Sequence, residues 1–412
     1  MLFDGKALQE ITENDLRERL VNAGLGEHFC LEYKQTFYEE TDRGRKEFLL
    51  DICMFANAQG GVLLIGIPEE RDEQDKHTGK PDRTAPLGIE TANPEPILQA
   101  YDASITDSIE ERLSVESVAI PVSDGRYVLA FRVPNSVNKP HCVRHMGHVY
   151  FPSRRQRHRY YMDVREIKEL AMTTASQQER AEQALYKTLE FVARSGQGND
   201  IVIGMGMMPV FSRDFLINLS SNHMVDAVRR FSIFPREESY PSIQYTYGGL
   251  KRSDDGKFSS YPPETMKLRR NGPISLRTNV PLKVSLQEAE TPSFYPVVID
   301  RLIRRFISRA KELYALAELS GPDVLGVQVS IPPNFVALYE ISRVPIYQDR
   351  PINVGAQNRY YGPLIIDDLS GPPEKLMAPI CHHIHQTFGQ KGSPCFDGGG
   401  NWICGDEKAA TD

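Results

Sequence analysis

The sequence predicts an α+β fold in two domains. Apolar runs of strand length alternate with segments whose apolar residues recur at helical spacing. The residue pattern changes after residue 194: from there on, short strand-like runs separated by turns predominate. The chain has 412 residues, more than a single domain usually holds. We therefore predict a mixed α/β domain over 1–175, a helical linker over 176–194 and a second α+β domain over 195–412.

The first domain is predicted to centre on a strand that is buried on both faces. The run 62–67 is almost continuously apolar, as expected of a central strand, and Gly60-Gly61 separates it from the preceding helix. We interpret Asn57 as a cap for the end of that helix, in preference to a catalytic role. The polar segment 69–93 is expected to be a loop. Helices are predicted at 15–23, 45–57, 95–113 and 163–193, and strands at 29–34, 62–67, 117–122, 127–133 and 148–151.

In the second domain, strand-like runs alternate with turns around one long amphipathic helix. That helix, 296–320, carries arginines on one face and apolar residues on the other, which favours a packed helix with a solvated face. We interpret Gly204 and Gly206 as structural glycines. Strands are predicted at 201–204, 242–247, 274–277, 282–287, 325–331 and 345–347, and a last helix at 374–388.

The composition excludes several classes of protein. A net charge of −7 argues against a polybasic coat protein, so any phosphate binding needs a local basic patch. No stretch approaches the roughly 20 apolar residues that span a bilayer, and the N-terminus lacks a signal-peptide pattern. Six dispersed cysteines favour a reducing compartment over a disulfide framework. We expect a cytoplasmic protein without membrane contact.

Five segments of the first half, taken together in this order, resemble the sequence pattern of a known domain family. They are Glu27-x-x-x-x-Glu32-Tyr33-Lys34, the helix end 55–61 (Phe-Ala-Asn-Ala-Gln-Gly-Gly), the strand 62–67 (Val-Leu-Leu-Ile-Gly-Ile), the segment 138–141 (Asn-Lys-Pro-His) and Tyr150-Phe151 before a basic stretch. Together they resemble the Schlafen AlbA-type domain (divergent AAA-4) over about 27–172. The C-terminal half resembles no family that we recognise.

The resemblance implies a nucleic-acid-handling domain and, in some members, a metal-dependent endoribonuclease. Carried over to this sequence, Glu27 and Glu32 would be catalytic metal ligands for Mg²⁺ or Mn²⁺, with Lys34 holding the phosphate. The family's third carboxylate is an aspartate, but here Glu69 and Glu70 follow Pro68 at that place. The alternative is that Glu32 and Lys34 form a surface ion pair and Glu27 is solvated.

A basic and aromatic segment over 139–161 predicts the contact with nucleic acid. Arginine pairs with phosphate and stacks on bases, and interleaved tyrosines favour single strands. The alternative is that the segment 139–161 is a solvated loop whose positive charges face the acidic stretch 69–82 of the same chain. The predicted nucleic-acid-binding residues are Lys34, Lys139, His141, Arg144, Arg154, Arg155, Arg157 and Arg159.

Cysteines and histidines gather near the C-terminus without the spacing of a zinc finger. Cys381 and His385 lie four residues apart on one face of the predicted helix 374–388. We do not expect zinc there, because no Cys-x-x-Cys pair accompanies them. Buried side chains without a metal are the preferred interpretation.

Three functions remain in view. The first is a DNA- or RNA-binding protein without catalysis, regulatory or defence-related. The second is a metal-dependent endoribonuclease that uses Glu27, Glu32 and Glu69 or Glu70. The third is a small-molecule sensor or protein-interaction module in the C-terminal half. Nucleic acid is the expected partner, and a homo-oligomer stays open.

Overall fold

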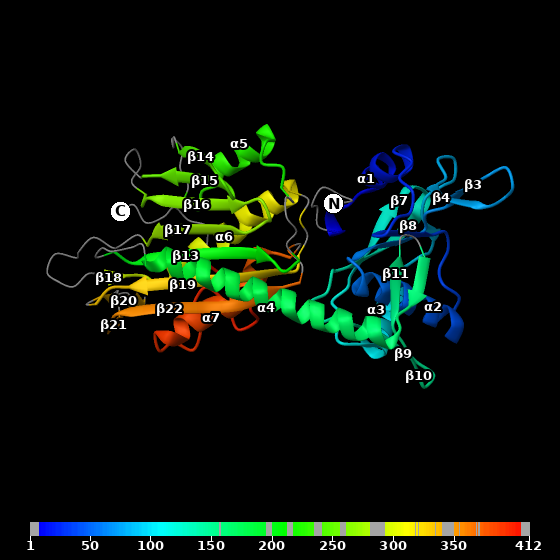
Figure 1. Ribbon diagram of the computed structural model, residues 1–412. Helices are drawn as coiled ribbons and strands as arrows, with labels where there is room; N and C mark the ends of the chain where they lie inside the picture. The colour runs from blue at the N-terminus through cyan, green and yellow to red at the C-terminus, as the bar shows by residue number, and fades with distance from the viewer. Residues whose placement is uncertain are drawn as a thin grey trace. The chain divides into compact units, whose positions relative to one another are not determined.

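A computed structural model gives the fold in two compact units, which are described separately. One comprises Met1–Gln178 with Ser320–Pro322, and the other Glu179–Leu319 with Asp323–Asp412 (Figure 1). The described residues are 8–155, 158–194, 200–211, 217–234, 241–255, 261–280, 293–317, 319, 321–333, 335–339, 350–353, 355–367, 369 and 371–404. Helices and strands occur in both units, which confirms the α+β class.

The first unit is built on a five-stranded mixed sheet. Strand β1 (Leu31–Lys34) pairs in parallel with β2 (Gly61–Ile65), and β8 (Arg126–Val133) pairs antiparallel with the other edge of β2. β7 (Glu116–Val122) and the short β5 (Ile89–Glu90) both pair antiparallel with β8. A 3₁₀ turn, Ser123–Gly125, joins β7 to β8, and its Asp-Gly pair is typical of hairpin turns.

Both faces of this sheet are covered, which confirms the prediction for the central strand. Leu63 and Ile65 of β2 pack in one core with α2 (Asp42–Asn57) and α3 (Glu95–Ser108). Val62 and Leu64 point the other way, into a core with the N-terminal helices. This follows from the two-residue period of a strand. The N-terminal helices are a 3₁₀ turn, Leu8–Glu10, α1 (Glu13–Leu16) and a π-helix, Arg17–Asn22.

The segment 69–93, predicted as a loop, contains a hairpin. β3 (Glu69–Arg71) pairs antiparallel with β4 (His77–Pro81), and Asp72 accepts backbone N–H bonds across the turn. The hairpin was missed because its strands are polar on both faces and show no apolar alternation. The loop prediction is therefore wrong for 69–81.

Two hairpins follow the sheet and lie against α2. β9 (Cys142–His145) pairs with β10 (His148–Tyr150) and with β6 (Ile109–Glu110), and β11 (Pro152–Arg155) pairs with β12 (His158–Tyr161).

Asn57 holds both hairpins to α2. It accepts the His141 N–H at 2.7 Å and donates to the carbonyls of His141 and Pro152 at 2.9 and 2.8 Å. The capping interpretation of Asn57 is wrong, because its amide serves distant backbone and not the helix end.

The second unit contains a seven-stranded sheet between two layers of helix. All of its pairings are antiparallel, in the order β14-β15-β16-β17-β13-β19-β22. The strands are β13 (Val202–Pro209), β14 (Ser242–Thr246), β15 (Gly249–Asp254), β16 (Glu264–Arg269), β17 (Ile274–Asn279), β19 (Asp323–Ile331) and β22 (Gln357–Ile366).

The helices of this unit pack on opposite faces of the sheet. Leu185 of α4 (Val164–Arg194) lies over Gly206, where a Cβ would come within 2.6 Å of its Cδ1. The predicted linker 176–194 is part of α4. On the other face, the methionines of β13 share a core with α5 (Asn222–Arg230), α6 (Val297–Leu316) and α7 (Pro373–Thr387). Gly206 is thus structural, as interpreted.

Smaller features complete the second unit. β18 (Ser293–Phe294), β20 (Val336–Tyr339) and β21 (Arg350–Asn353) form a three-stranded sheet. The strands predicted at 282–287 and 345–347 lie outside the described residues. Cys395 and Cys404 form a disulfide, and the other four cysteines, Cys30, Cys53, Cys142 and Cys381, are free. Within the described part of the chain, no helix is long and apolar enough to cross a bilayer.

Candidate nucleic-acid site

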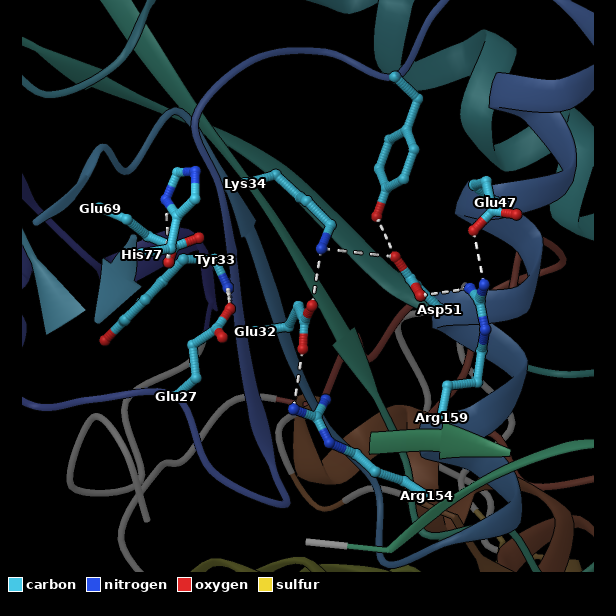
Figure 2. A network of polar contacts seen from close by, with 11 residues as sticks. Glu27, Glu32, Tyr33, Lys34, Glu47, Asp51, Glu69, His77, Arg154 and Arg159 are labelled. Atoms are coloured by element: carbon cyan, nitrogen blue, oxygen red, sulfur yellow. Dashed lines mark hydrogen bonds and ion pairs between the residues drawn. The ribbon is translucent and has the colours of Figure 1, made fainter. Parts of the chain in front are cut away.

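A pocket of about 440 Å³ opens in the first unit where β1, α2 and β12 meet. Side chains from three separate stretches of the chain form it (Figure 2). The lining residues are Glu32, Lys34, Tyr38, Glu47, Asp51, Met54, His158 and Arg159. Its size falls at the small end of the roughly 300–1,000 Å³ that ligand sites occupy.

Strand β1 presents Glu32 and Lys34 to this pocket. Leu31 and Tyr33 are buried on the opposite face, so the two charged residues share the remaining face of the strand. The Lys34 ammonium donates to Glu32 Oε1 at 2.6 Å and lies 3.8 Å from Asp51 Oδ2. Burial alone would lower the pKa of Lys34, but the Asp51 and Glu32 carboxylates raise it above its usual value.

Helix α2 supplies two carboxylates that the sequence analysis missed. Asp51 Oδ1 accepts from Arg159 Nη1 at 2.9 Å, and Asp51 Oδ2 accepts from the Tyr38 hydroxyl at 2.6 Å. Arg159 Nη2 also donates to Glu47 Oε2 at 2.6 Å. Burial raises the pKa of Asp51, and the Lys34 charge opposes that rise. Glu47 and Asp51 lie four residues apart on a helix, a spacing that could have indicated a shared acidic face.

Arg154 lies in the interior of the unit and not in an exposed basic patch. Its side chain is 0% exposed, its Nη2 lies 2.8 Å from Glu32 Oε2, and its guanidinium sits 5.1 Å from the centre of the Phe55 ring. Arg154 and Arg159 are opposite each other in the β11–β12 pairing, so both face α2. Arg154 and Arg159, both predicted to bind nucleic acid, therefore form ion pairs with the carboxylates that line the pocket.

Glu27 lies beside the pocket residues but turns its carboxylate to the backbone. Glu27 Oε1 accepts the Tyr33 N–H at 2.8 Å, and its own N–H donates to the carbonyl of Gly79 in β4. Burial raises the pKa of Glu27 to about 7, and the neighbouring Glu32 and Glu69 carboxylates add to the rise. The Glu27 carboxyl thus lies within electrostatic range of two further acidic side chains.

The predicted third carboxylate belongs to the β3–β4 hairpin. Glu69 Oε2 lies 3.5 Å from His77 Nδ1, and Glu70, which is exposed, accepts from the Thr78 hydroxyl at 3.4 Å. Figure 2 shows Glu69 and His77 on the Glu27 side of Lys34.

The acidic residues fit a divalent cation poorly in this arrangement. Both Glu32 oxygens are engaged, one by Lys34 and one by Arg154. Among the described residues, no group of three His, Cys, Asp or Glu side chains could hold a metal ion. The prediction of Mg²⁺ or Mn²⁺ at Glu27, Glu32, Glu69 and Glu70 stays a prediction, and no reaction step is derived from it.

Lys139 and His141 are occupied inside the unit. Lys139 Nζ donates to the carbonyl of Ala58 and to Asn135 Oδ1, and burial lowers its pKa to about 8. The His141 side chain is buried, its Nδ1 lies 2.9 Å from the carbonyl of Glu111, and burial lowers its pKa as well. These two residues hold the loop before β9 in place, which leaves them little access to a phosphate.

Arg144 and Arg155 are the predicted arginines that reach the surface. Arg144 is 63% exposed beside Glu110, and Arg155 is 70% exposed between Glu166 and the Tyr160 ring. Arg157 lies outside the described residues.

Aromatic rings gather on the surface near the β9–β10 and β11–β12 hairpins. The ring centres of Tyr150 and Tyr161 are 5.7 Å apart, and Lys46 Nζ lies 4.0 Å above the Tyr150 ring. His148 is exposed with its ring 6.2 Å from that of Tyr150, and Tyr161 is 51% exposed. We call Lys46, His148, Tyr150 and Tyr161 the tyrosine patch.

Comparison with known proteins assigns this unit. Residues 27–165 match the family model described as Schlafen, AlbA_2. The N-terminal unit carries a Schlafen AlbA_2 domain. The matched range contains every residue that lines the pocket and the whole tyrosine patch. The resemblance drawn from the five sequence segments is thereby confirmed for the N-terminal half.

A solved structure is similar to part of this chain. It is the solution structure of the N-terminal domain of a putative ATP-dependent DNA helicase RecG-related protein from Nitrosomonas europaea, at 18% identity and a TM-score of 0.27. The similarity covers 37% of this chain and 93% of that one. No curated protein matches the chain.

The C-terminal histidine and cysteine pair lies in the core of the second unit. His385 Nε2 is 2.9 Å from Asp300 Oδ2, and the Ser393 hydroxyl donates to the same oxygen at 2.5 Å. Cys381 is buried one helical turn before His385. Hydrogen bonding to Asp300 fixes the His385 ring in this core.

Proposed function

We propose that the AlbA_2 domain binds single-stranded nucleic acid through the tyrosine patch. The observation that carries the proposal is the pairing of the Tyr150 and Tyr161 rings, with Lys46 over the first. Tyr161 is exposed and Tyr150 is half-buried. The accessible parts of such rings offer stacking surfaces to unpaired bases, and a cation beside them attracts the phosphate backbone. The Schlafen AlbA_2 match supports a nucleic-acid-related role for the same unit.

Arg155 offers a further exposed cation on the other face of the β11–β12 hairpin. Its exposed guanidinium stacks on Tyr160 and pairs with Glu166 at the start of α4. A surface ion pair of this kind costs little to exchange for a phosphate, because solvent screens it in the free protein. Binding therefore draws on a local positive surface in a chain whose net charge is −7.

The test is fluorescence anisotropy with labelled single- and double-stranded DNA and RNA, over about 50–200 mM salt. Wild-type protein should prefer single strands. Arg155→Ala should lower the salt slope of log K by about 1, the value for one phosphate contact. Arg165→Ala is the matched control, since Arg165 is an exposed arginine paired with Glu169 on α4.

A separate substitution tests the contribution of base stacking. Tyr161→Ala should weaken binding of every single strand, while Tyr245→Ala, which removes an exposed tyrosine from the second unit, should not. Absence of binding at low salt would sink the proposal. Parallel incubations with Mn²⁺ test the endoribonuclease alternative, for which cleavage lost in Glu32→Ala is the expected sign.

A further inference from the structure

The pocket beside the tyrosine patch sets three carboxylates against two cations and is therefore unsuited to a phosphate. Its two cations, Lys34 and Arg159, are both held by carboxylates. A phosphate that entered would face the Glu32, Glu47 and Asp51 carboxylates at close range, and like charges repel strongly where burial reduces screening. The ligand of this pocket must instead carry both hydrogen-bond donors and acceptors.

Two groups in the pocket retain hydrogen-bonding capacity toward such a ligand. Glu47 is 41% exposed and uses Oε2 for Arg159, while no described residue donates to its Oε1. Lys34 is 33% exposed and has three protons, with Glu32 and Asp51 as its ion-pair partners. The pocket thus offers a carboxylate acceptor and an ammonium donor, with Tyr38 and Met54 also among its lining residues.

We propose that this pocket receives an unstacked guanine base of the bound strand, an inference that rests on the proposed nucleic-acid binding. Guanine presents the N1–H and the 2-amino group side by side, so Glu47 Oε1 accepts one of them and Oε2, which also accepts from Arg159, takes the other through its second lone pair. Guanine O6 accepts from Lys34.

The other bases match this donor set less well. Adenine places its amino group where guanine has O6, and so sets a donor against Lys34. Cytosine and uracil or thymine each present only one donor position on that edge. The tyrosine patch would stack the flanking bases while the pocket reads one base. The division of labour follows the general pattern in which backbone contacts position a strand and base edges specify it.

The experiment compares short labelled homopolymers, oligothymidylate and oligouridylate, with versions carrying one central guanine, inosine or adenine. Inosine differs from guanine only by the missing 2-amino group. A single guanine should tighten binding about tenfold over the homopolymer, the effect of one good bidentate contact, and inosine should lose most of that gain.

Glu47→Gln should abolish the preference for guanine over inosine, because its amide group turns a donor toward the base. Glu169→Gln, an exposed glutamate of α4, is the matched control and should keep the preference.

The outcomes separate the two proposals. Equal affinity for guanine, inosine and adenine, with clear binding of the homopolymer, overturns the guanine pocket alone. No binding of any strand overturns the proposed function as well. The wild-type comparison of guanine with inosine decides the inference even where a substitution in the pocket unfolds the protein.

Discussion

Arg159 on β12 donates to Asp51 on α2 across 2.9 Å, although 108 residues of chain separate them. The same guanidinium reaches Glu47 one helical turn earlier, so a single side chain spans two turns of α2. This contact fixes the β11–β12 hairpin against the helix and closes one side of the pocket. Its removal would leave the buried Asp51 carboxylate with Tyr38 and the more distant Lys34.

Arg159→Ala should therefore lower the free energy of unfolding by about 1–3 kcal/mol, the cost of stripping a partner from a buried charged group. Urea denaturation followed by circular dichroism measures the change. Arg165→Ala, which removes an exposed arginine from the same unit, should change stability by less than about 0.5 kcal/mol. Equal effects of the two variants would show that the contact with Asp51 is not stabilising.

Asn57→Ala should destabilise the first unit by at least about 2 kcal/mol, because it leaves the buried His141 N–H and two carbonyls without their partner. Asn57→Asp should also destabilise, since a carboxylate keeps the acceptor but sets negative charge against both carbonyls. The control is Asn138→Ala at an exposed position. Urea midpoints for the three variants test this, and a mild effect of Asn57→Ala would argue against the bridging role.

Glu27 should make stability depend on pH in a defined direction. Because its pKa rises to about 7 in the folded state, the folded protein binds a proton more readily than the unfolded chain between about pH 4.5 and 7. The contribution of this group is therefore present below pH 4.5 and is lost as the pH rises through 7. Unfolding titrations of wild type and Glu27→Gln across that range measure it. The wild type should lose stability relative to the variant as the pH rises, and a constant difference would contradict the prediction.

Gly61→Ala should destabilise the first unit by about 1–3 kcal/mol through overpacking. A Cβ at this position would lie 2.4 Å from the Phe55 ring and 2.8 Å from the carbonyl of Cys30. Gly125→Ala serves for comparison, because nothing lies within 4 Å of the added carbon and only its φ of +68° resists the change. Thermal melts should rank the Gly61 variant below the Gly125 variant, and the reverse order would exclude overpacking as the cause.

Strand periodicity was enough to predict one side of the site. Glu32 and Lys34 are two residues apart in the predicted strand 29–34, so the strand period places both on one face, and their contact follows from that period. The same period separates Arg154, which is buried, from Arg155, which is exposed, but composition alone presented them as one basic patch. The sequence shows how many positively charged residues the segment has. The pairing of β11 with β12 decides which of them face α2.

The remainder of the site depends on tertiary contacts that no local pattern encodes. Asp51 occurs among the apolar residues of α2, and its partners Arg159 and Lys34 come from distant strands. The family's third carboxylate lies just after the strand that corresponds to β2, and in this chain Glu69 and Glu70 occupy that place. The structure places Asp51 nearer to Lys34, from a helix that the sequence analysis treated only as core.

The residues on the two sides of the pocket lie far apart in the sequence, which has a consequence for cotranslational folding. A ribosome releases β1 and α2 well before it releases Arg159, so the nascent chain must carry Asp51 for a time without its guanidinium partner. Asn57 likewise waits for Pro152, 95 residues later. The AlbA_2 domain should therefore acquire its pocket in one late cotranslational step, and a chain stopped before β12 should expose α2 to chaperones and proteases.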